Sequence, residues 1–338
     1  MRLLLIFVSC VILLFLLTGC GQTAAVPEEG RTVKAHPAPE HTAASSIERQ
    51  ADSPSRQFVS ALKSSPGLLK AGGKAGEEWS ANGLKMKFCW CPPGSFRMGS
   101  PSHERGYDLA QDQVDVTLTK GFWLGKYEVT QGEWQRLIGT TIVEQSKKGV
   151  DSSLSGEGEA YPMYYTIDED AIPFCEKLTQ QERAAGRLPG DWEFRLPTEA
   201  QWEYACRAGT STATAFGDSL RSKQANFNGS EPYFGSPGES GENIGHSVPV
   251  GSYAANDWGL CDMHGNVAEV CRDWFLLPLP GGTDPERTTR EEGCGRIERG
   301  GCWFSKGHEC RSAFRRNEFD SGRSSGTGFR VAIVQLTK

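Results

Sequence analysis

The sequence predicts an α+β domain that is rich in loops, with small antiparallel sheets and two to three helices. Three observations support this class. The 338 residues include 9 tryptophans and 40 glycines, so glycine makes up about 12% of the chain against a usual ~7%. Short segments of strand composition alternate with turn signals. Capping motifs mark the starts of helices. This composition excludes a helical bundle or a coiled coil.

The predicted strands are short. Residues 86–91 have strand composition and end at the turn signal Pro92-Pro93-Gly94, after which residues 95–99 are expected to return as a hairpin partner. Further strands are predicted at 114–118, 122–129, 296–303 and 328–334. From Gly209 onward the sequence shows almost no helical periodicity, which indicates long loops. Long loops are unusual inside a compact domain unless metal ions or disulfides hold them in place or they have a binding role.

The first helix is predicted to begin after Thr130. Thr130 and Glu133 form a capping box, in which each side chain satisfies a free backbone N–H group at the helix start. Trp134, Leu137 and Ile138 follow at positions i, i+3 and i+4. One face of this helix is therefore expected to be buried.

Two further helices are expected. One covers residues 172–185 and ends at Gly186. The other has Thr198 as its cap and Gln201 as the reciprocal partner. Glu199 and Glu203 lie one turn apart on this helix and could suggest acid–base chemistry. The favoured interpretation is a solvated helix start with an ion pair from Glu203 to Arg207.

The N-terminus predicts export and a lipid anchor. Arg2 precedes an apolar run from Leu3 to Leu17, which is short for a membrane span and typical of a secretory signal. The sequence Leu17-Thr18-Gly19-Cys20 resembles a bacterial lipobox, which implies that Cys20 is lipidated and becomes the first residue of the mature protein. An ordinary signal peptide, cut near Gly21, is the alternative. The expected location is the bacterial cell envelope, on the periplasmic or extracytoplasmic face.

Three regions are therefore expected along the chain: a signal peptide at 1–19, the lipidated cysteine with a tether at 20–75, and a domain at 76–338. Residues 21–57 hold almost no large apolar side chains and cannot bury enough surface to offset their ordering entropy. A short amphipathic piece with Leu68 and Leu69 either packs on the domain or forms a loose helix. The net charge of −6 leaves no basic excess for nucleic acid.

The cysteines separate into groups. Of 11 cysteines, Cys10 leaves with the signal and Cys20 carries lipid, so nine remain and at least one stays unpaired within the chain. Those on predicted strands and helices are expected to lie in the core: Cys89, Cys91, Cys175 and Cys206. Zinc is not expected, because no Cys-X-X-Cys occurs and the six histidines are scattered.

Six motifs, taken in order, resemble the formylglycine-generating enzyme (sulfatase-modifying factor) family over residues 83–336. They are Pro93-Gly94-Ser95-Phe96-Arg97-Met98-Gly99-Ser100, Tyr127-Glu128-Val129-Thr130, the segment from Arg195 to Ala205, Gly259-Leu260-Cys261-Asp262-Met263-His264-Gly265-Asn266-Val267, Arg299-Gly300-Gly301 and Gly328-Phe329-Arg330. The resemblance implies a C-type-lectin-like fold. It also implies an activity, in which two cysteines bind copper(I) and oxygen converts a substrate cysteine to formylglycine.

The candidate catalytic residues implied by this resemblance are Cys310 and Cys302. Counted forward from the glycine pair, Cys310 falls on a catalytic cysteine position of the family. When positions are counted back from Arg315, the two catalytic cysteines of the family correspond to Gly307 and Ser312. The catalytic pair is therefore incomplete whichever way the positions are counted. Cys302 takes the place of a family serine near the active centre. Both tryptophans of the family's Gly-Asn-Val-Trp-Glu-Trp motif are also missing.

The resemblance further implies calcium. The family's ligands around the Gly-Asn motif correspond to Asp262, Gly265, Val267 and Glu269, and a hard calcium ion takes six to eight oxygens of this kind. The alternative without a metal ion is that the two carboxylates cap turns or pair with Arg272. A second calcium site would begin at Asn226 and Phe227, with Glu242 as a guess for its carboxylate.

Two functions remain open at this point. One is an oxygen- or copper-dependent oxidoreductase that acts on a protein or peptide cysteine. The other is a catalytically silent module that binds a peptide or glycan at the cell envelope. The sequence names no substrate.

Overall fold

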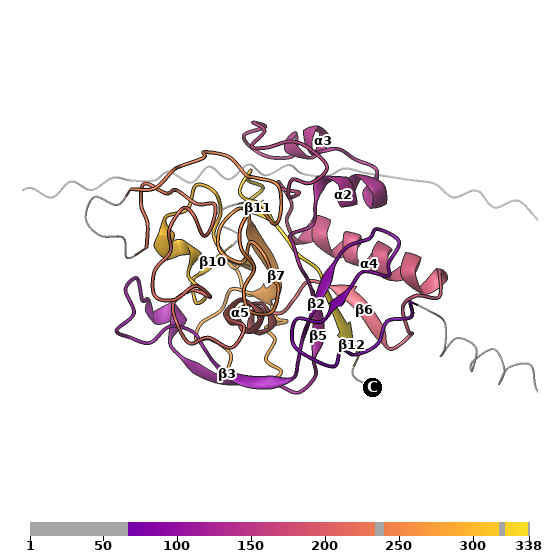
Figure 1. Cartoon of the computed structure of the whole chain (residues 1–338), viewed down its shortest axis with the longest axis horizontal. Helices are drawn as coiled ribbons and strands as arrows, with labels where there is room; N and C mark the ends of the chain where they lie inside the picture. The colour runs from indigo at the N-terminus through magenta and orange to yellow at the C-terminus, as the bar shows by residue number, and fades with distance from the viewer. Residues whose placement is uncertain (1–66, 234–239, 318–321, 337–338) are drawn as a thin grey trace, which may run out of the picture. The chain divides into compact units, whose positions relative to one another are not determined.

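A five-stranded antiparallel sheet crosses the computed structural model, which describes residues 67–233, 240–317 and 322–336 (Figure 1). These residues belong to one compact unit of the chain. The strand order is β1-β2-β5-β12-β6. The strands are β1 (Glu78–Trp79), β2 (Phe88–Cys91), β5 (Phe122–Gly125), β12 (Ala332–Gln335) and β6 (Trp192–Arg195).

Two smaller sheets complete the β structure. One has the order β10-β9-β7-β11, and in it β11 runs parallel to β7. The other has the order β3-β4-β8. Their strands are β7 (Ala268–Trp274), β9 (Arg296–Arg299), β10 (Arg315–Asn317), β11 (Thr327–Gly328), β3 (Gly94–Met98), β4 (Val114–Leu118) and β8 (Gly282–Thr283).

The described residues form four α-helices and two short 3₁₀ helices. They are α2 (Gln131–Ile138), α3 (Ile142–Ser146), α4 (Asp168–Ala184), α5 (Glu199–Arg207), η1 (Leu109–Gln111) and η2 (Gly307–Cys310). None of these helices is both long and apolar enough to cross a bilayer. The predicted signal peptide lies outside the described residues. The predicted α+β class with small sheets and short helices is confirmed.

The predicted hairpin between residues 86–91 and 95–99 is wrong. β3 pairs with β4, with Phe96 opposite Val116, and not with β2. Both edges of β2 are already taken, because Cys89 lies opposite Glu78 of β1 on one side and Leu124 of β5 on the other. The chain therefore leaves the first sheet at Pro92-Pro93, and β3 begins another sheet.

The last predicted strand, 328–334, divides between two sheets. Thr327–Gly328 forms β11 beside β7, and Ala332–Gln335 forms β12 beside β5 and β6. A Cβ atom on Gly328 would lie 2.5 Å from the carbonyl oxygen of Met163, so only glycine fits there. This segment joins the two larger sheets, and its intervening Phe329 and Arg330 are fully buried.

The predicted caps are confirmed, and one helix start is corrected. Thr130 and Thr198 cap α2 and α5, each with its reciprocal partner. α4 begins at Asp168, four residues before the predicted start. Three acidic residues occupy its first turn, where the helix dipole favours negative charge, and the Asp170 carboxylate accepts a hydrogen bond from the Ile167 N–H group.

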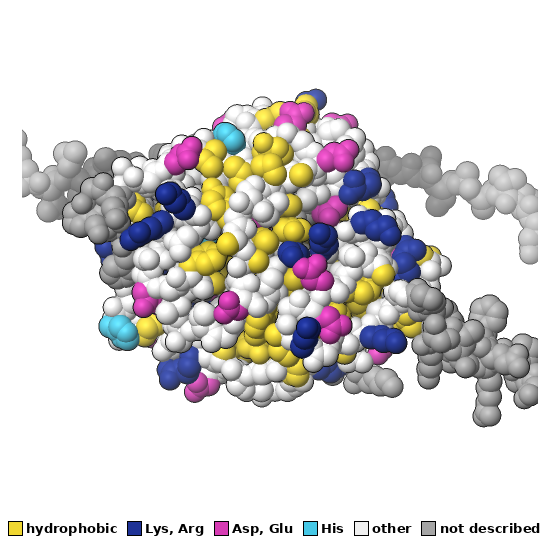
Figure 2. All heavy atoms as spheres, in the orientation of Figure 1, with side chains coloured by type: hydrophobic (Ala, Val, Ile, Leu, Met, Phe, Trp, Pro, Cys, Tyr) yellow, Lys and Arg dark blue, Asp and Glu magenta, His cyan; other side chains and the backbone are white. Residues whose placement is uncertain are grey.

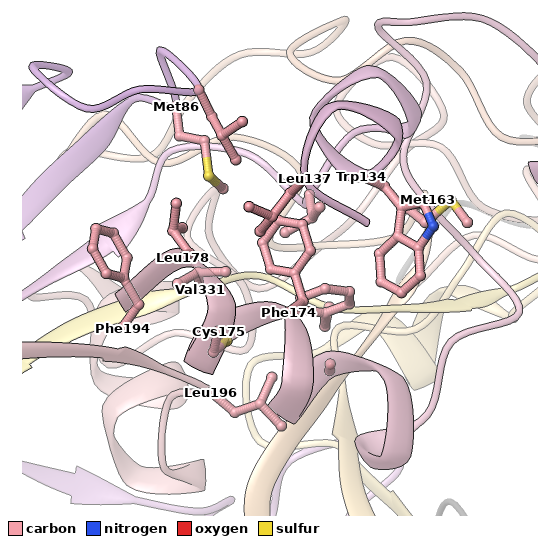
Figure 3. Packing of buried hydrophobic residues seen from close by; sticks show 14 of the residues in the cluster. Met86, Trp134, Leu137, Met163, Phe174, Cys175, Leu178, Phe194, Leu196 and Val331 are labelled. Carbon is pink, nitrogen blue, oxygen red and sulfur yellow. The ribbon is translucent and has the colours of Figure 1, made fainter. Parts of the chain in front are cut away.

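Aromatic side chains fill the core between the first sheet and α2 and α4. Trp134 of α2 stacks on Phe174 of α4 with ring centroids 5.7 Å apart, and Phe174 meets Phe329 edge to face at 5.4 Å (Figure 3). Leu69 is also in this core, with 1% of its surface exposed, and its N–H group bonds the carbonyl of Arg187. Residues 69–75, assigned to the predicted tether, thus belong to the fold. The earlier part of that tether lies outside the described residues.

A network of buried ion pairs joins α5 to the second sheet. The Glu199 carboxylate accepts two hydrogen bonds of 2.8 Å from Arg315 on β10, one from Nε and one from Nη2. Glu203 pairs with Arg207 at 2.9 Å and with Arg299 on β9. Both glutamates are fully buried, so the expected solvated helix start is wrong, whereas the pair with Arg207 is confirmed. Burial alone would raise the pKa of Glu203, but Arg207 and Arg299 hold it below its usual value.

A third buried carboxylate ties β7 to the last segment of the chain. Glu269 binds Arg330 through both oxygens at 2.5 Å and accepts a hydrogen bond from the Trp202 indole at 2.7 Å. The guanidinium of Arg330 also donates to the carbonyl of Cys261 at 3.0 Å. The charged residues of the motifs thus hold α5, β7, β9 and β10 together in the middle of the domain.

Replacing Glu199 by Gln should destabilise the fold strongly, because Arg315 would remain buried without a counter-charge. The expected loss is about 3–5 kcal/mol in the free energy of unfolding, measured by urea titration. The control is Asp115→Asn in the exposed pair with Arg97, which should cost less than about 1 kcal/mol. Equal small losses in both variants would contradict a structural role for the buried pair.

Candidate functional site

Of the two candidate catalytic thiols, Cys302 directly follows a tight glycine turn and Cys310 packs against that turn. Gly300 and Gly301 both have positive φ angles, +88° and +69°. A Cβ atom on Gly301 would lie 2.7 Å from the Cys310 Sγ atom, so Cys310 packs against the backbone that leads into Cys302. The Cys302 Sγ atom lies 3.5 Å from the hydroxyl of Ser305, which also accepts a bond from the Cys302 N–H group.

Both thiols are closed to solvent. Cys302 and Cys310 each have 0% of their surface exposed. Burial raises the pKa of Cys302, and burial together with the neighbouring Cys302 raises the pKa of Cys310 well above its usual value. Each thiol therefore keeps its proton at neutral pH. Copper(I) binds thiolates, so it would have to displace both protons and reach two side chains that are closed to solvent.

The two carboxylates of the first predicted calcium set, Asp262 and Glu269, already accept hydrogen bonds from protein groups. Both Glu269 oxygens accept hydrogen bonds, Oε1 from Arg330 and Oε2 from Arg330 and the Trp202 indole. Asp262 turns its Oδ2 atom to the N–H group of Gly251 at 2.6 Å. The alternative pair with Arg272 does not form either. Among the described residues, no three His, Cys, Asp or Glu side chains are grouped as a metal cluster.

The second predicted position leaves one buried side-chain oxygen without a partner. Asn226 is 2% exposed, and its side-chain Oδ1 atom is buried with no hydrogen-bond partner. Its Nδ2 atom donates to the carbonyl of His246 at 3.0 Å and to the Oδ1 atom of Asn266 at 3.2 Å. The free oxygen is of the type that calcium prefers. Phe227 follows with a fully buried ring, and the side chain of Glu242 is exposed.

A buried carboxylate that sequence reasoning passed over lies beside these residues. One oxygen of Glu128 accepts a bond from Asn266 at 3.1 Å, and the other is buried without a partner. Burial, followed by the charge of Asp262, raises the pKa of Glu128 well above its usual value. Burial also raises the pKa of Asp262 to about 6. The Tyr127-Glu128 motif marks this position in the sequence, but nothing in the motif predicts that the Glu128 carboxylate is buried.

His264 was also unassigned, and it supports the loop that carries Cys310. Its Nδ1–H group donates to the Cys310 carbonyl at 2.7 Å, and its Nε2 atom accepts from the Ala215 N–H group at 3.0 Å. Burial lowers the pKa of His264 to about 4, so the ring is neutral. With both nitrogens occupied by backbone groups, His264 holds the loop in place and is not available as a general base.

Apolar side chains stand on two loops, one that follows α3 and one that follows Cys302. Val150 and Leu154 follow α3, and Trp303 and Phe304 follow Cys302; we call these four residues the loop surface. Val150 is fully exposed, and Leu154 and Phe304 are 40% and 43% exposed. Figure 2 shows hydrophobic side chains at several places on the face of the domain that is seen in Figure 1.

Hydrogen bonds connect the two halves of the loop surface. The Tyr165 hydroxyl donates to the carbonyl of Ser153, and the Tyr165 N–H group donates to the carbonyl of Ser324. The Trp303 indole donates to the carbonyl of Ser325 at 3.2 Å, and the ring of Phe304 packs at Gly326. The apolar side chains therefore stand on one connected set of loops.

These features define a loop-rich, C-type-lectin-like domain whose motif charges are structural and whose thiols are buried. Residues 79–335 match the family model described as a sulfatase-modifying factor enzyme 1-like domain. The chain belongs to this family, as its motifs indicated.

Curated relatives match different shares of the chain. A serine/threonine-protein kinase, pkn1 of Chlamydia caviae, is 36% identical over 142 residues, and the match covers 41% of this chain and 21% of that protein. The chaperone protein LppX of Paenibacillus barcinonensis is 28% identical over 259 residues, covering 64% and 81%. The formylglycine-generating enzyme of Streptomyces coelicolor is 35% identical over 197 residues, covering 55% and 56%. The chain thus spans about a fifth of the kinase and most of LppX.

A solved structure shows a similar fold. PvdO from Pseudomonas aeruginosa superposes with a TM-score of 0.62 and 26% sequence identity, covering 78% of this chain and all of that one. Variable protein 1 of Treponema denticola, at 24% identity and a TM-score of 0.55, shares the fold.

Alkylation of the folded protein should be confined to one described cysteine. All nine described cysteines are free thiols, and Cys294 alone among them is partly exposed. We expect iodoacetamide at pH 8 to modify Cys294 at least about tenfold faster than Cys302 or Cys310, as read by peptide mass mapping. The same reaction in denaturant should label every thiol. Rapid labelling of Cys310 in the folded state would contradict the closed site.

Proposed function

We propose that this chain is a lipid-anchored member of its family that binds a polypeptide at the cell envelope without oxidising it. The observation that carries the proposal is the state of the thiols. Cys302 and Cys310 are both fully buried, and their pKa values are raised. A cysteine oxidation that depends on copper(I) requires thiolates that the metal and the substrate can reach.

The loop surface is the binding face that we assign to the polypeptide. Exposed apolar side chains on loops are a common feature of protein-binding surfaces. Val150, Leu154 and Phe304 are the exposed apolar groups there. The relative LppX, of which this chain covers most, is named a chaperone protein, and this supports a role in which an unfolded or partly folded chain is the ligand.

One observation favours the second candidate function, which is oxidation of a protein cysteine. Cys310 packs against Gly301, the residue before Cys302, so a second thiol lies close to the one candidate catalytic cysteine that the motif count supports. Incubation of the protein with a Cys-X-Pro-X-Arg peptide, copper and oxygen separates the two candidates. An unchanged peptide mass supports the binding function, and conversion of the cysteine to formylglycine supports the oxidase.

The anchor is the part of the proposal that rests on Cys20, which lies outside the described residues. The Leu17-Thr18-Gly19-Cys20 sequence supports it. Cells grown with radioactive palmitate should incorporate label into this protein and none into the Cys20→Ala variant. Unlabelled wild-type protein that is released into the periplasm would indicate an ordinary signal peptide.

The loop surface should suppress aggregation of an unfolded chain. We expect stoichiometric protein to lower the light scattering of reduced insulin B chain severalfold, because apolar side chains on the loops cover those of the client. The double variant Val150→Ser and Phe304→Ser should lose most of this effect. Leu336→Ser, which removes an apolar side chain of 38% exposure from the end of β12, is the matched control and should retain it. Equal suppression by both variants would contradict the assignment of this face.

We also propose that a calcium ion binds at Asn226 and stabilises the loops around it, because its buried Oδ1 atom lacks a partner. Millimolar calcium, at a concentration about 100 times its Kd, should raise the melting temperature by roughly 5 °C relative to the protein in EDTA. The shift should vanish in Asn226→Ala and persist in Asp262→Asn, since Glu269 and Arg330 are already paired. A shift that is lost only in Asp262→Asn would place the ion at the other predicted set.

A further inference from the structure

Two exposed leucines that do not belong to the loop surface lie on neighbouring loops. Leu109, in η1, is 76% exposed, and Leu277, which follows β7, is 59% exposed. One buried guanidinium holds the two loops together, because the Arg315 Nη1 atom donates to the carbonyls of Ala110 and Leu276, each at 3.2 Å. The backbone beside each leucine is therefore fixed against the other loop. We call Leu109 and Leu277 the leucine patch.

A second contact fixes the same two loops. Leu279 is buried beside Gly99, where a Cβ atom would lie 3.0 Å from the Leu279 Cδ1 atom and 2.5 Å from the Gln111 carbonyl oxygen. The end of η1 and residues 276–279 thus meet at one glycine. Single exposed apolar side chains are common on protein surfaces, but two leucines on loops that are pinned to each other are typical of a contact surface.

The leucine patch has a negative charge at one end and a positive charge at the other. Asp108 directly precedes Leu109, and its Oδ1 atom accepts a hydrogen bond from the Ala110 N–H group at 2.8 Å. Arg287 lies beside Leu277, since its Nη2 atom donates to the carbonyl of Pro278 at 3.0 Å. Within the described residues neither Asp108 nor Arg287 forms an ion pair. Both charges are therefore available to a partner.

We propose that the leucine patch is the contact between two copies of this chain that are related by a two-fold axis. The rotation places Leu109 of one copy on Leu277 of the other, and the reverse contact forms at the same time. It also brings Asp108 of each copy to face Arg287 of the second copy. A patch with opposite charges at its two ends is complementary to itself, which is what a two-fold interface requires.

The contact is expected to be weak in solution and favoured on a membrane. Four leucines bury much less surface than a standard protein interface, which begins at about 1,200 Å². Here the inference rests on the proposed function, because the lipid on Cys20 would hold the copies in one plane and raise their effective concentration. Anchored copies should therefore pair at amounts at which the free chain is a monomer.

A charge exchange between two variants tests the contact, measured by sedimentation equilibrium of the mature protein in density-matched detergent. We expect the wild type to dimerise with a Kd of roughly 10–100 μM. Asp108→Lys and Arg287→Glu should each weaken dimerisation at least about tenfold, because like charges then meet twice. An equimolar mixture of the two variants should restore it, since one end of the mixed dimer keeps the native pair and the other pairs the introduced lysine and glutamate. Misfolding of either variant could not be repaired by mixing.

Cysteine cross-linking in cells tests the same contact on the membrane. The background is Cys294→Ser, because Cys294 is the partly exposed cysteine among those described. Oxidation should join Leu109→Cys chains to co-expressed Leu277→Cys chains, whereas Leu336→Cys chains should stay single. If the mixture of charge variants dimerises in detergent but cells give no cross-link and no palmitate label, the interface stands and the anchor on Cys20 is wrong.

Three results would overturn the inference. One is a wild type that stays a monomer at about 200 μM while it carries the palmitate label. Another is a mixture of the charge variants that dimerises no better than either variant alone. The third is a dimer that persists in the double variant Leu109→Ser and Leu277→Ser but is lost in Val150→Ser and Phe304→Ser, which would make the loop surface the contact between copies.

Discussion

The ion pairs between α5 and the second sheet are the constraint on which the rest of the domain depends. Glu199 and Glu203 enter the core as charges, and they can remain there only because Arg315 and Arg299 reach them from β10 and β9. Removing any partner leaves a buried charge. Because much of the backbone is irregular, few β-sheet hydrogen bonds are available to set the geometry of the domain. The directional hydrogen bonds of these ion pairs therefore fix how the helix, the strands and the loops meet.

Motif residues that mark the family therefore serve the fold in this chain. Glu203 and Arg299 join α5 to β9, and Glu269 with Arg330 joins β7 to the final segment. These contacts can persist when the chemistry changes, because they lie below the surface where substrates bind. The two candidate thiols of this chain also lie in the core, and burial raises the pKa of each.

Local features of this fold could be predicted from the sequence, and distant pairings could not. The caps at Thr130 and Thr198 depend on residues three positions away, so the sequence shows both partners together. Arg315, the partner of Glu199, lies 116 residues further along the chain. The residues around Glu199 therefore indicated only a solvated helix start. The same limit explains the wrong partner for β3 and the strand that divided at Gly328. At the candidate site, positions were predictable from motifs, but burial of the thiols depends on packing.

Copper(I) titration of the reduced protein tests the central claim, that this chain retains the family fold with a closed thiol site. With a competing chromogenic chelator, the account predicts no sub-nanomolar binding and identical curves for the wild type and Cys310→Ala. Binding of one copper(I) ion with sub-nanomolar affinity that disappears in Cys310→Ala would contradict it, because the thiols would then be accessible as thiolates in the folded protein.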